Sequence, residues 1–232
     1  VYLLQDDDTP RPFDDDRLHV IRLARRPTYL DWVRQTRLHC PGHITVLANS
    51  DIWFDAGIAL LRDIMANDAR AFVALSRYDA VSGALQPHDN PHWSQDTWAY
   101  HAAQDISPAM ARQLDFPLGL PRCDNKIAYV FSVNGFTLYN PFHAITSVHQ
   151  HETNLRYYDK TGDTSIVGGM AMVHPGATLT SPAAIEIKIW SLNTKQYQSV
   201  QINNALERWA VARHHKTEAQ QGVFGYDADW QY

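Results

Sequence analysis

The chain has 232 residues, of which 45% are hydrophobic and 19% charged, proportions typical of a folded globular protein rather than a disordered one. Its formal net charge of −5 at pH 7 argues against general binding to nucleic acid or to anionic membranes. The sequence shows no signal peptide and no apolar run near the ~18 residues that a membrane span needs, so we expect a soluble protein, with the cytoplasm slightly preferred.

Strand-like and helix-like segments alternate along the first two-thirds of the chain. Short runs rich in apolar and β-branched residues predict strands, and such runs fall at 1–4, 18–23, 44–48, 71–75, 97–101, 136–139 and 145–149. Thr28, with Asp31 three residues later, predicts a capped helix. Asp55 predicts the start of a second helix, and Gly135 the end of a third that begins at Asn125. This order predicts an α/β fold with a mainly parallel sheet flanked by helices.

The last third of the chain has a less regular pattern. Strands are indicated at 166–169 and 184–192, and a helix at 204–214. The sequence contains no convincing linker before this part. We therefore expect residues 1–160 to form the core and residues 161–232 to form an irregular C-terminal extension packed on it.

The clearest chemical signal follows the apolar run at 44–48, which ends in the polar triplet Asn49-Ser50-Asp51. Ligands of α/β folds bind outside the carboxyl ends of the strands. A carboxylate in that place suits a hard divalent cation that bridges to a diphosphate. Asp51 is therefore a candidate metal ligand, although aspartate is also common as a turn residue after a strand.

Two later groups carry related chemistry. Asp124 comes directly before the helix expected from Asn125, where it either caps the helix or takes a proton from a hydroxyl held in an open cleft. His149 and His151 are two residues apart, so on a strand they share one face. Neutral imidazole is a good ligand for divalent metals, and either histidine is a candidate.

From residue 20 to about residue 155, the order of these features resembles the GT-A class of nucleotide-sugar glycosyltransferases. In that class a strand ends in a DxD-type metal motif, and Asn49-Ser50-Asp51 stands in its place, with asparagine instead of the first aspartate. Cys123-Asp124-Asn125 matches the class's xED motif, and His149-Gln150-His151 matches its metal-binding histidine. If residues 1–4 form the second strand of that fold, the base-binding first strand is missing from this chain.

The resemblance implies a glycosyltransferase that moves a sugar from a nucleotide-diphosphate donor to a hydroxyl of a carbohydrate, protein or other acceptor. It implies a divalent metal, Mn²⁺ or Mg²⁺, held by Asp51 and by His149 or His151. It also implies inversion of configuration, with Asp124 as the base that accepts the proton of the acceptor.

Further side chains are expected to contact substrates. Polar groups beside an aromatic side chain suit a sugar, and Gln95 and Asp96 precede a strand that contains Trp98. The guanidinium fork of Arg26 suits a diphosphate. The complete set of expected substrate contacts is Arg26, Asn49, Ser50, Gln95, Asp96, Trp98 and Asn125.

Two other functions fit the same residues. One is a metal-dependent phosphoester hydrolase, and the other is a non-catalytic carbohydrate-binding or assembly module on a degenerate transferase scaffold, which Asn49 favours. The acidic runs at 6–8 and 14–16 are rival metal sites, but they lie in a proline-containing polar loop, where blocks of like charge are usually solvated. The donor, the acceptor and the oligomeric state are left open.

Overall fold

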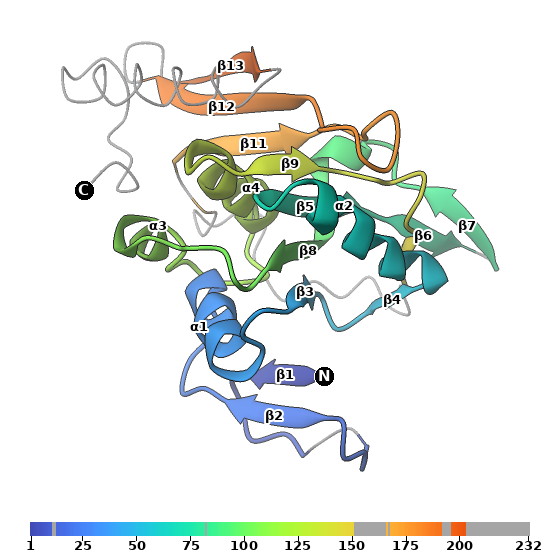
Figure 1. Cartoon of the computed structure of the whole chain (residues 1–232), viewed down its shortest axis with the longest axis vertical. Helices are drawn as coiled ribbons and strands as arrows, with labels where there is room; N and C mark the ends of the chain where they lie inside the picture. Colours follow the sequence, from blue (N-terminus) through green and yellow to red (C-terminus); the bar gives the residue numbers. More distant parts are fainter. Residues whose placement is uncertain (11–12, 82, 151–165, 167, 192–195, 203–232) are drawn as a thin grey trace.

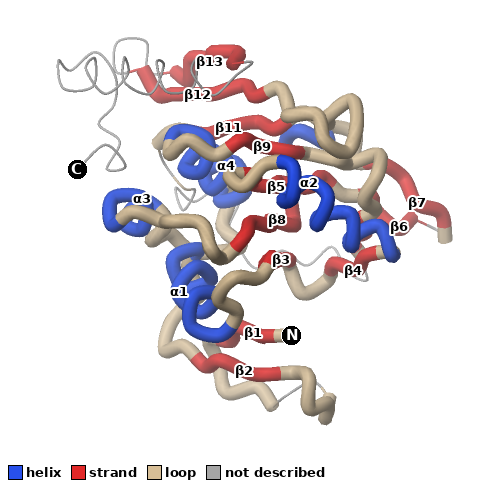
Figure 2. Tube along the Cα trace, viewed as in Figure 1, coloured by secondary structure: helices blue, strands red, loops and turns tan. Residues whose placement is uncertain are grey.

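The structure is a computed structural model, shown in Figures 1 and 2, that describes residues 1–10, 13–81, 83–150, 166, 168–191 and 196–202. Within these residues the protein is an α/β structure in which helices cover mixed β-sheets. None of the described helices is long and apolar enough to cross a membrane.

A four-stranded sheet forms the centre of the molecule. Its strands are β3 (Ile44–Ala48), β8 (Gln95–His101), β5 (Ala71–Ser76) and β9 (Thr137–Tyr139), in the order β3-β8-β5-β9. The strand β8 runs antiparallel to both of its neighbours, whereas β5 and β9 are parallel. The ends of β3 and β5 and the start of β8 therefore lie along the same edge of the sheet.

Both faces of this sheet are buried. Phe72 and Ala74 of β5 belong to a core cluster that includes side chains of α1 (Tyr29–His39), α3 (Pro108–Gln113) and α4 (Cys123–Val133). Val73 and Leu75, which point the opposite way because side chains alternate along a strand, pack in a second cluster with α2 (Leu61–Asn67). Every residue of β5 is buried, which explains its continuous apolar sequence.

Three smaller sheets surround this centre. The first pairs β4 (Ile52–Phe54), β10 (Ser147–His149), β6 (Tyr78–Val81) and β7 (Ala84–Pro87) in the order β4-β10-β6-β7. The second is antiparallel and consists of β11 (Met170–Val173), β12 (Ile185–Ser191) and β13 (Gln196–Ile202). The third is the parallel pair β1 (Tyr2–Gln5) and β2 (His19–Arg22).

Local sequence signals explain where the helices begin and end. Thr28 caps α1, and its hydroxyl and the Asp31 carboxylate satisfy each other's backbone N–H groups, as the sequence predicts. Asp55 caps a short 3₁₀ turn, η1 (Ala56–Leu60), that leads into α2. Gly135 follows α4 with a φ of 83°, a conformation in which glycine carries no steric cost.

The prediction of a mainly parallel sheet is wrong. It assumed that each strand is followed by a helical crossover, but the chain between β5 and β8 forms the β6–β7 hairpin and the 3₁₀ turn η2 (Pro91–Trp93) instead. Without a helical crossover, the chain returns beside β5 in the opposite direction, as antiparallel neighbours can.

The C-terminal part differs from the expectation in its details. The strand expected at 166–169 begins only at Met170, and the helix expected at 204–214 lies outside the described residues. Ala171 of β11 and Ile187 of β12 are fully buried in the same cluster as α1 and α4. The described strands of this part therefore share the main hydrophobic core.

Candidate functional site

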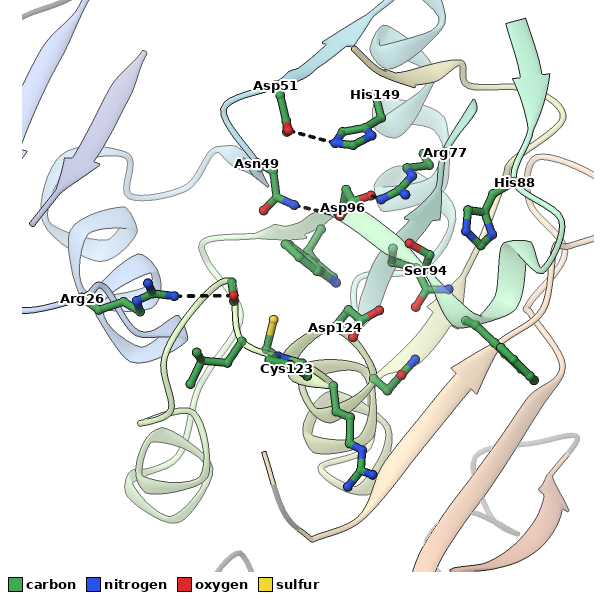
Figure 3. Close-up of a pocket in the computed structure, with 18 residues that line it drawn as sticks. Arg26, Asn49, Asp51, Arg77, His88, Ser94, Asp96, Cys123, Asp124 and His149 are labelled. Carbon is green, nitrogen blue, oxygen red and sulfur yellow. Dashed lines mark hydrogen bonds and ion pairs between the residues drawn. The ribbon is translucent and has the colours of Figure 1, made fainter. Parts of the chain in front are cut away.

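A pocket of about 640 Å³ opens at the edge of the central sheet where β3 and β5 end and β8 begins (Figure 3). Because β8 is antiparallel to β3, the start of β8 lies beside the residues after β3, and the backbone N–H of Asn49 donates to the carbonyl of Asp96 at 3.1 Å. The N-terminus of α4 and the loop before it form another wall. His149, at the end of β10, contributes from the neighbouring sheet.

Most of the expected site residues meet in this pocket. Its lining includes Arg26, Asn49, Asp51, Gln95, Asp96, Trp98, Asp124, Asn125 and His149. Ser50, between β3 and β4, is exposed and is not among the lining residues. His151 lies outside the described residues, so the structure places only His149 of the two histidines.

Arg77, which the sequence motifs do not include, joins the carboxylates of Asp96 and Asp79. The Asn49 amide donates to Oδ1 of Asp96 at 2.7 Å, and Arg77 donates to the other oxygen of Asp96. The Nε atom of Arg77 also donates to Asp79 at 3.0 Å. The Arg77 side chain is only 13% exposed. Although burial works against its charge, the two carboxylates outweigh this effect and raise the pKa of Arg77.

His149 stands between two carboxylates. Its Nε2 lies 2.8 Å from Oδ2 of Asp51, and its Nδ1 lies 3.4 Å from Oδ1 of Asp79. The imidazole is buried, whereas the Asp51 side chain is 48% exposed. With Arg77, these contacts form a continuous chain of polar side chains from Asn49 to Asp51 along one wall of the pocket.

Asp124 lies in the first turn of α4 rather than in front of it. The helix begins at Cys123, two residues earlier than expected, after Arg122 in the left-handed conformation (φ 73°). Desolvation, followed by the nearby charge of Asp96, raises the pKa of Asp124 to about 7, although backbone N–H groups of Asn125 and Gln95 donate to its carboxylate. A carboxyl group with this pKa is partly protonated at neutral pH.

Three buried polar groups line the pocket near Asp124 without a hydrogen-bond partner among the described residues. They are Oε1 of Gln95, Nδ2 of Asn125 and Nε1 of Trp98. Buried polar atoms are normally paired, because leaving one without a hydrogen bond costs about 1–3 kcal/mol. Such atoms beside a pocket are suited to hydrogen bonding with a polar ligand or with water.

The sequence predicts that Trp98 packs against a sugar, but its ring offers no face to the pocket for stacking. It is 2% exposed and packs edge-to-face against Tyr29, with ring centroids 5.3 Å apart. The exposed aromatic side chain of the pocket is Trp93, 52% exposed, which the sequence reading passed over. The sequence signal for an exposed Trp93 is its position two residues after Pro91, among polar residues.

Arg26 lies on the side of the pocket opposite His88 (Figure 3). Its guanidinium donates to the carbonyl oxygens of Leu118 and Gly119, at 3.3 and 3.5 Å, and so holds the loop that leads to α4. A cation at this rim favours an anionic ligand.

In the described part of the chain, Asp51 and His149 are the pair that fits a divalent cation. No group of three or more His, Cys, Asp or Glu side chains within the described ranges is arranged to hold a metal ion. Mg²⁺, however, commonly takes one or two protein ligands and completes its shell with water and substrate phosphates. A cation held by Asp51 and Nε2 of His149 would replace the proton between them and leave the ring proton on Nδ1, where Asp79 would orient the imidazole.

Searches of family models, curated proteins and solved structures returned no match to the chain.

Proposed function

We propose that the protein is a metal-dependent glycosyltransferase that moves a sugar from a nucleotide-diphosphate donor to an acceptor hydroxyl, with inversion. The observation that carries the proposal is that Asp124 and the Asp51–His149 pair line one pocket. Its volume of about 640 Å³ lies within the usual range for ligand sites. The ordered motifs of the sequence support the same function.

Asp124 is the proposed general base. The acceptor oxygen attacks the anomeric carbon and forms the new C–O bond, its proton passes to the Asp124 carboxylate, and the bond to the diphosphate oxygen breaks with its electron pair. A pKa of about 7 suits this role, because a base works best when its pKa is near the working pH. The environment that favours the protonated carboxyl is the buried wall beside Asp96.

The leaving diphosphate needs positive charge, and we propose Asp51 and His149 as the protein ligands of a divalent cation. When bound, that cation supplies electrostatic stabilisation of the negative charge on the leaving group. Arg26, which lines the same pocket, is proposed to contact the same diphosphate. Asn49 is assigned a supporting role, because its amide holds Asp96 through the 2.7 Å hydrogen bond.

The first test is binding. Thermal shifts would be measured with UDP, GDP, CDP and ADP at millimolar concentration, each with and without Mn²⁺, since a ligand of the native state raises its melting temperature. We expect a Mn²⁺-dependent rise for at least one nucleotide, lost in Asp51→Asn and retained in Asp124→Asn. If no nucleotide shifts the melting temperature with Mn²⁺, the proposal fails.

The second test is turnover. The UDP-, GDP-, CDP- and ADP-sugars would be incubated with Mn²⁺, and release of the nucleoside diphosphate would be measured with and without sugar acceptors. Acceptor-dependent release that falls in Asp124→Asn supports the transferase. Binding without release points to the non-catalytic module, and release of phosphate from simple phosphoesters points to the hydrolase.

A further inference from the structure

Trp93 is a large apolar surface placed at a polar pocket. Its side chain is 52% exposed, and it lines the pocket beside Ser94, Gln95 and Asp124. Tryptophan is usually mostly buried because its exposed surface is costly in water. A half-exposed indole that lines a pocket is therefore a candidate for contact with a ligand.

The turn that carries Trp93 is held firmly. The backbone N–H of Trp93 donates to the carbonyl of Asn90 at 3.0 Å. The carbonyl of Pro91 accepts from the Gln95 side chain at 3.1 Å and also from the Ser76 hydroxyl. These bonds fix η2 to the ends of β5 and β8, so the indole is presented on a fixed backbone.

The side chains next to Trp93 also restrict it. His92 stacks on His174, with ring centroids 4.4 Å apart and planes 14° from parallel. The Lys188 ammonium lies 5.8 Å from the Trp93 ring centroid. The platform formed by His92 and Trp93 is thus supported by the loop after β11 and by β12, the part of the molecule away from β4 and β10.

A pyranose ring matches these groups chemically. One of its faces presents C–H groups that can pack on an aromatic ring, and its edges present hydroxyl groups that both donate and accept. Two polar atoms of residues that line the same pocket as Trp93 have no hydrogen-bond partner in the described part of the chain: Oε1 of Gln95 is an acceptor, and Nδ2 of Asn125 is a donor. An apolar platform beside a few fixed polar groups is the usual composition of a small-molecule site.

We propose that Trp93 is the stacking platform of the acceptor subsite, and that the acceptor is a pyranoside whose reacting hydroxyl faces Asp124. This inference rests on the proposed transferase function for its assignment to the acceptor. In Figure 3, Asp124 and Ser94 lie together on the side of the pocket away from Asp51 and His149. An acceptor that displaces the diphosphate with inversion attacks from the face opposite the leaving group, so it belongs at this end.

The direct test is ligand-detected NMR. Saturation transfer to methyl α- and β-pyranosides of glucose, galactose and mannose would be measured at millimolar concentration, without nucleotide. We expect at least one pyranoside to bind, with strongest transfer to its ring C–H protons. Trp93→Ala should weaken that binding at least about fivefold, and Trp93→Phe, which keeps an aromatic face, should lose less.

Trp53→Ala is the matched control. Trp53, on β4, is 43% exposed and does not line the pocket, so its replacement should leave pyranoside binding unchanged. Melting temperatures of all three variants show whether the fold survives, and Trp93→Phe gives a second measurement should Trp93→Ala unfold.

The outcomes separate the two proposals. Absence of pyranoside binding to the wild-type protein, or equal binding to Trp93→Ala, overturns the sugar platform. Loss of uridine, guanosine, cytidine or adenosine binding in Trp93→Ala, with pyranoside binding intact, assigns Trp93 to the nucleotide base and also overturns it. A third outcome is that pyranoside binding depends on Trp93 but no nucleoside diphosphate stabilises the protein with Mn²⁺. In that case the sugar-binding site is supported and the proposed transferase function is overturned.

Discussion

Replacing Asp124 by asparagine should change how the stability of the protein depends on pH. The pKa of this carboxyl group rises from an ordinary value of 3.8 to about 7 in the folded protein, because desolvation and the charge of Asp96 disfavour its ionised form. Between these two values the folded state keeps a proton that the unfolded state has released. The free energy of unfolding therefore falls as the pH rises through this window, and the loss is complete above pH 7.

The size of the effect follows from the shift. Integrated from pH 5 to pH 8, a change from 3.8 to about 7 corresponds to roughly 2–3 kcal/mol at 1.36 kcal/mol per pKa unit. Because Asp124 is partly open to the pocket, we expect about 1–3 kcal/mol. Asp124→Asn has no such titration, so its melting temperature should gain about 2–9 °C on the wild type between pH 5 and pH 8.

The assay is differential scanning calorimetry of both proteins from pH 5 to pH 8 at constant ionic strength, with EDTA present. Pairwise comparison cancels the titration of every group that the two proteins share. Asp124→Ser also removes the charge and should show the same trend. A melting-temperature difference that stays constant across this range would refute the reasoning.

Acceptor transfer by Asp124→Asn should fall by roughly 10²–10⁴-fold relative to the wild type, and wild-type transfer should rise with pH through about 7.

Three further substitutions have expected outcomes, each measured by chemical denaturation. Arg77→Met leaves two carboxylates without their shared cation and should cost about 2–4 kcal/mol, whereas Arg17→Met at an exposed ion pair should change little. Gly169→Ala places a Cβ in steric conflict with the buried ring of Tyr129 and should cost at least about 1–3 kcal/mol; a neutral result would mean that the ring can move aside. Thr28→Ala removes the α1 cap and should cost about 1 kcal/mol, while Thr28→Ser should retain most of it.

Features fixed by neighbouring residues were the ones that the sequence predicted well. The capping box at Thr28 depends on residues three apart, and the strand at 44–48 has the bounds that its apolar run indicates. The turn at Gly135 needs only a residue that tolerates positive φ. Each of these features depends on residues close together in the sequence, so it can be predicted without knowledge of the rest of the fold.

The direction of β8 and the role of Arg77 depend on long-range pairing instead. An apolar strand has the same sequence pattern in either direction, so only the hairpin between β5 and β8 decides that they are antiparallel. Arg77 has no motif of its own. Its significance comes from Asp79, two residues on, and from Asp96, which β8 brings back beside the end of β5.

The same antiparallel return also explains how one pocket can hold carboxylates with different tasks. It places Asp96 where Arg77 and Asn49 bind both of its oxygens, so its charge is compensated by fixed partners. Asp124, nearby, is held by backbone N–H groups and feels the charge of Asp96, which favours its proton. Asp51, which is about half exposed, contacts Nε2 of His149 at 2.8 Å. Among these carboxyl groups, Asp124 is the one whose raised pKa suits acid–base work. Asp96 links the ion-paired wall of the pocket to Asp124, because its charge raises the pKa of Asp124. Asp96→Asn should therefore lower the pKa of Asp124 and move the midpoint of the pH profile of transfer to lower pH. An unchanged midpoint would show that desolvation alone sets the pKa of Asp124.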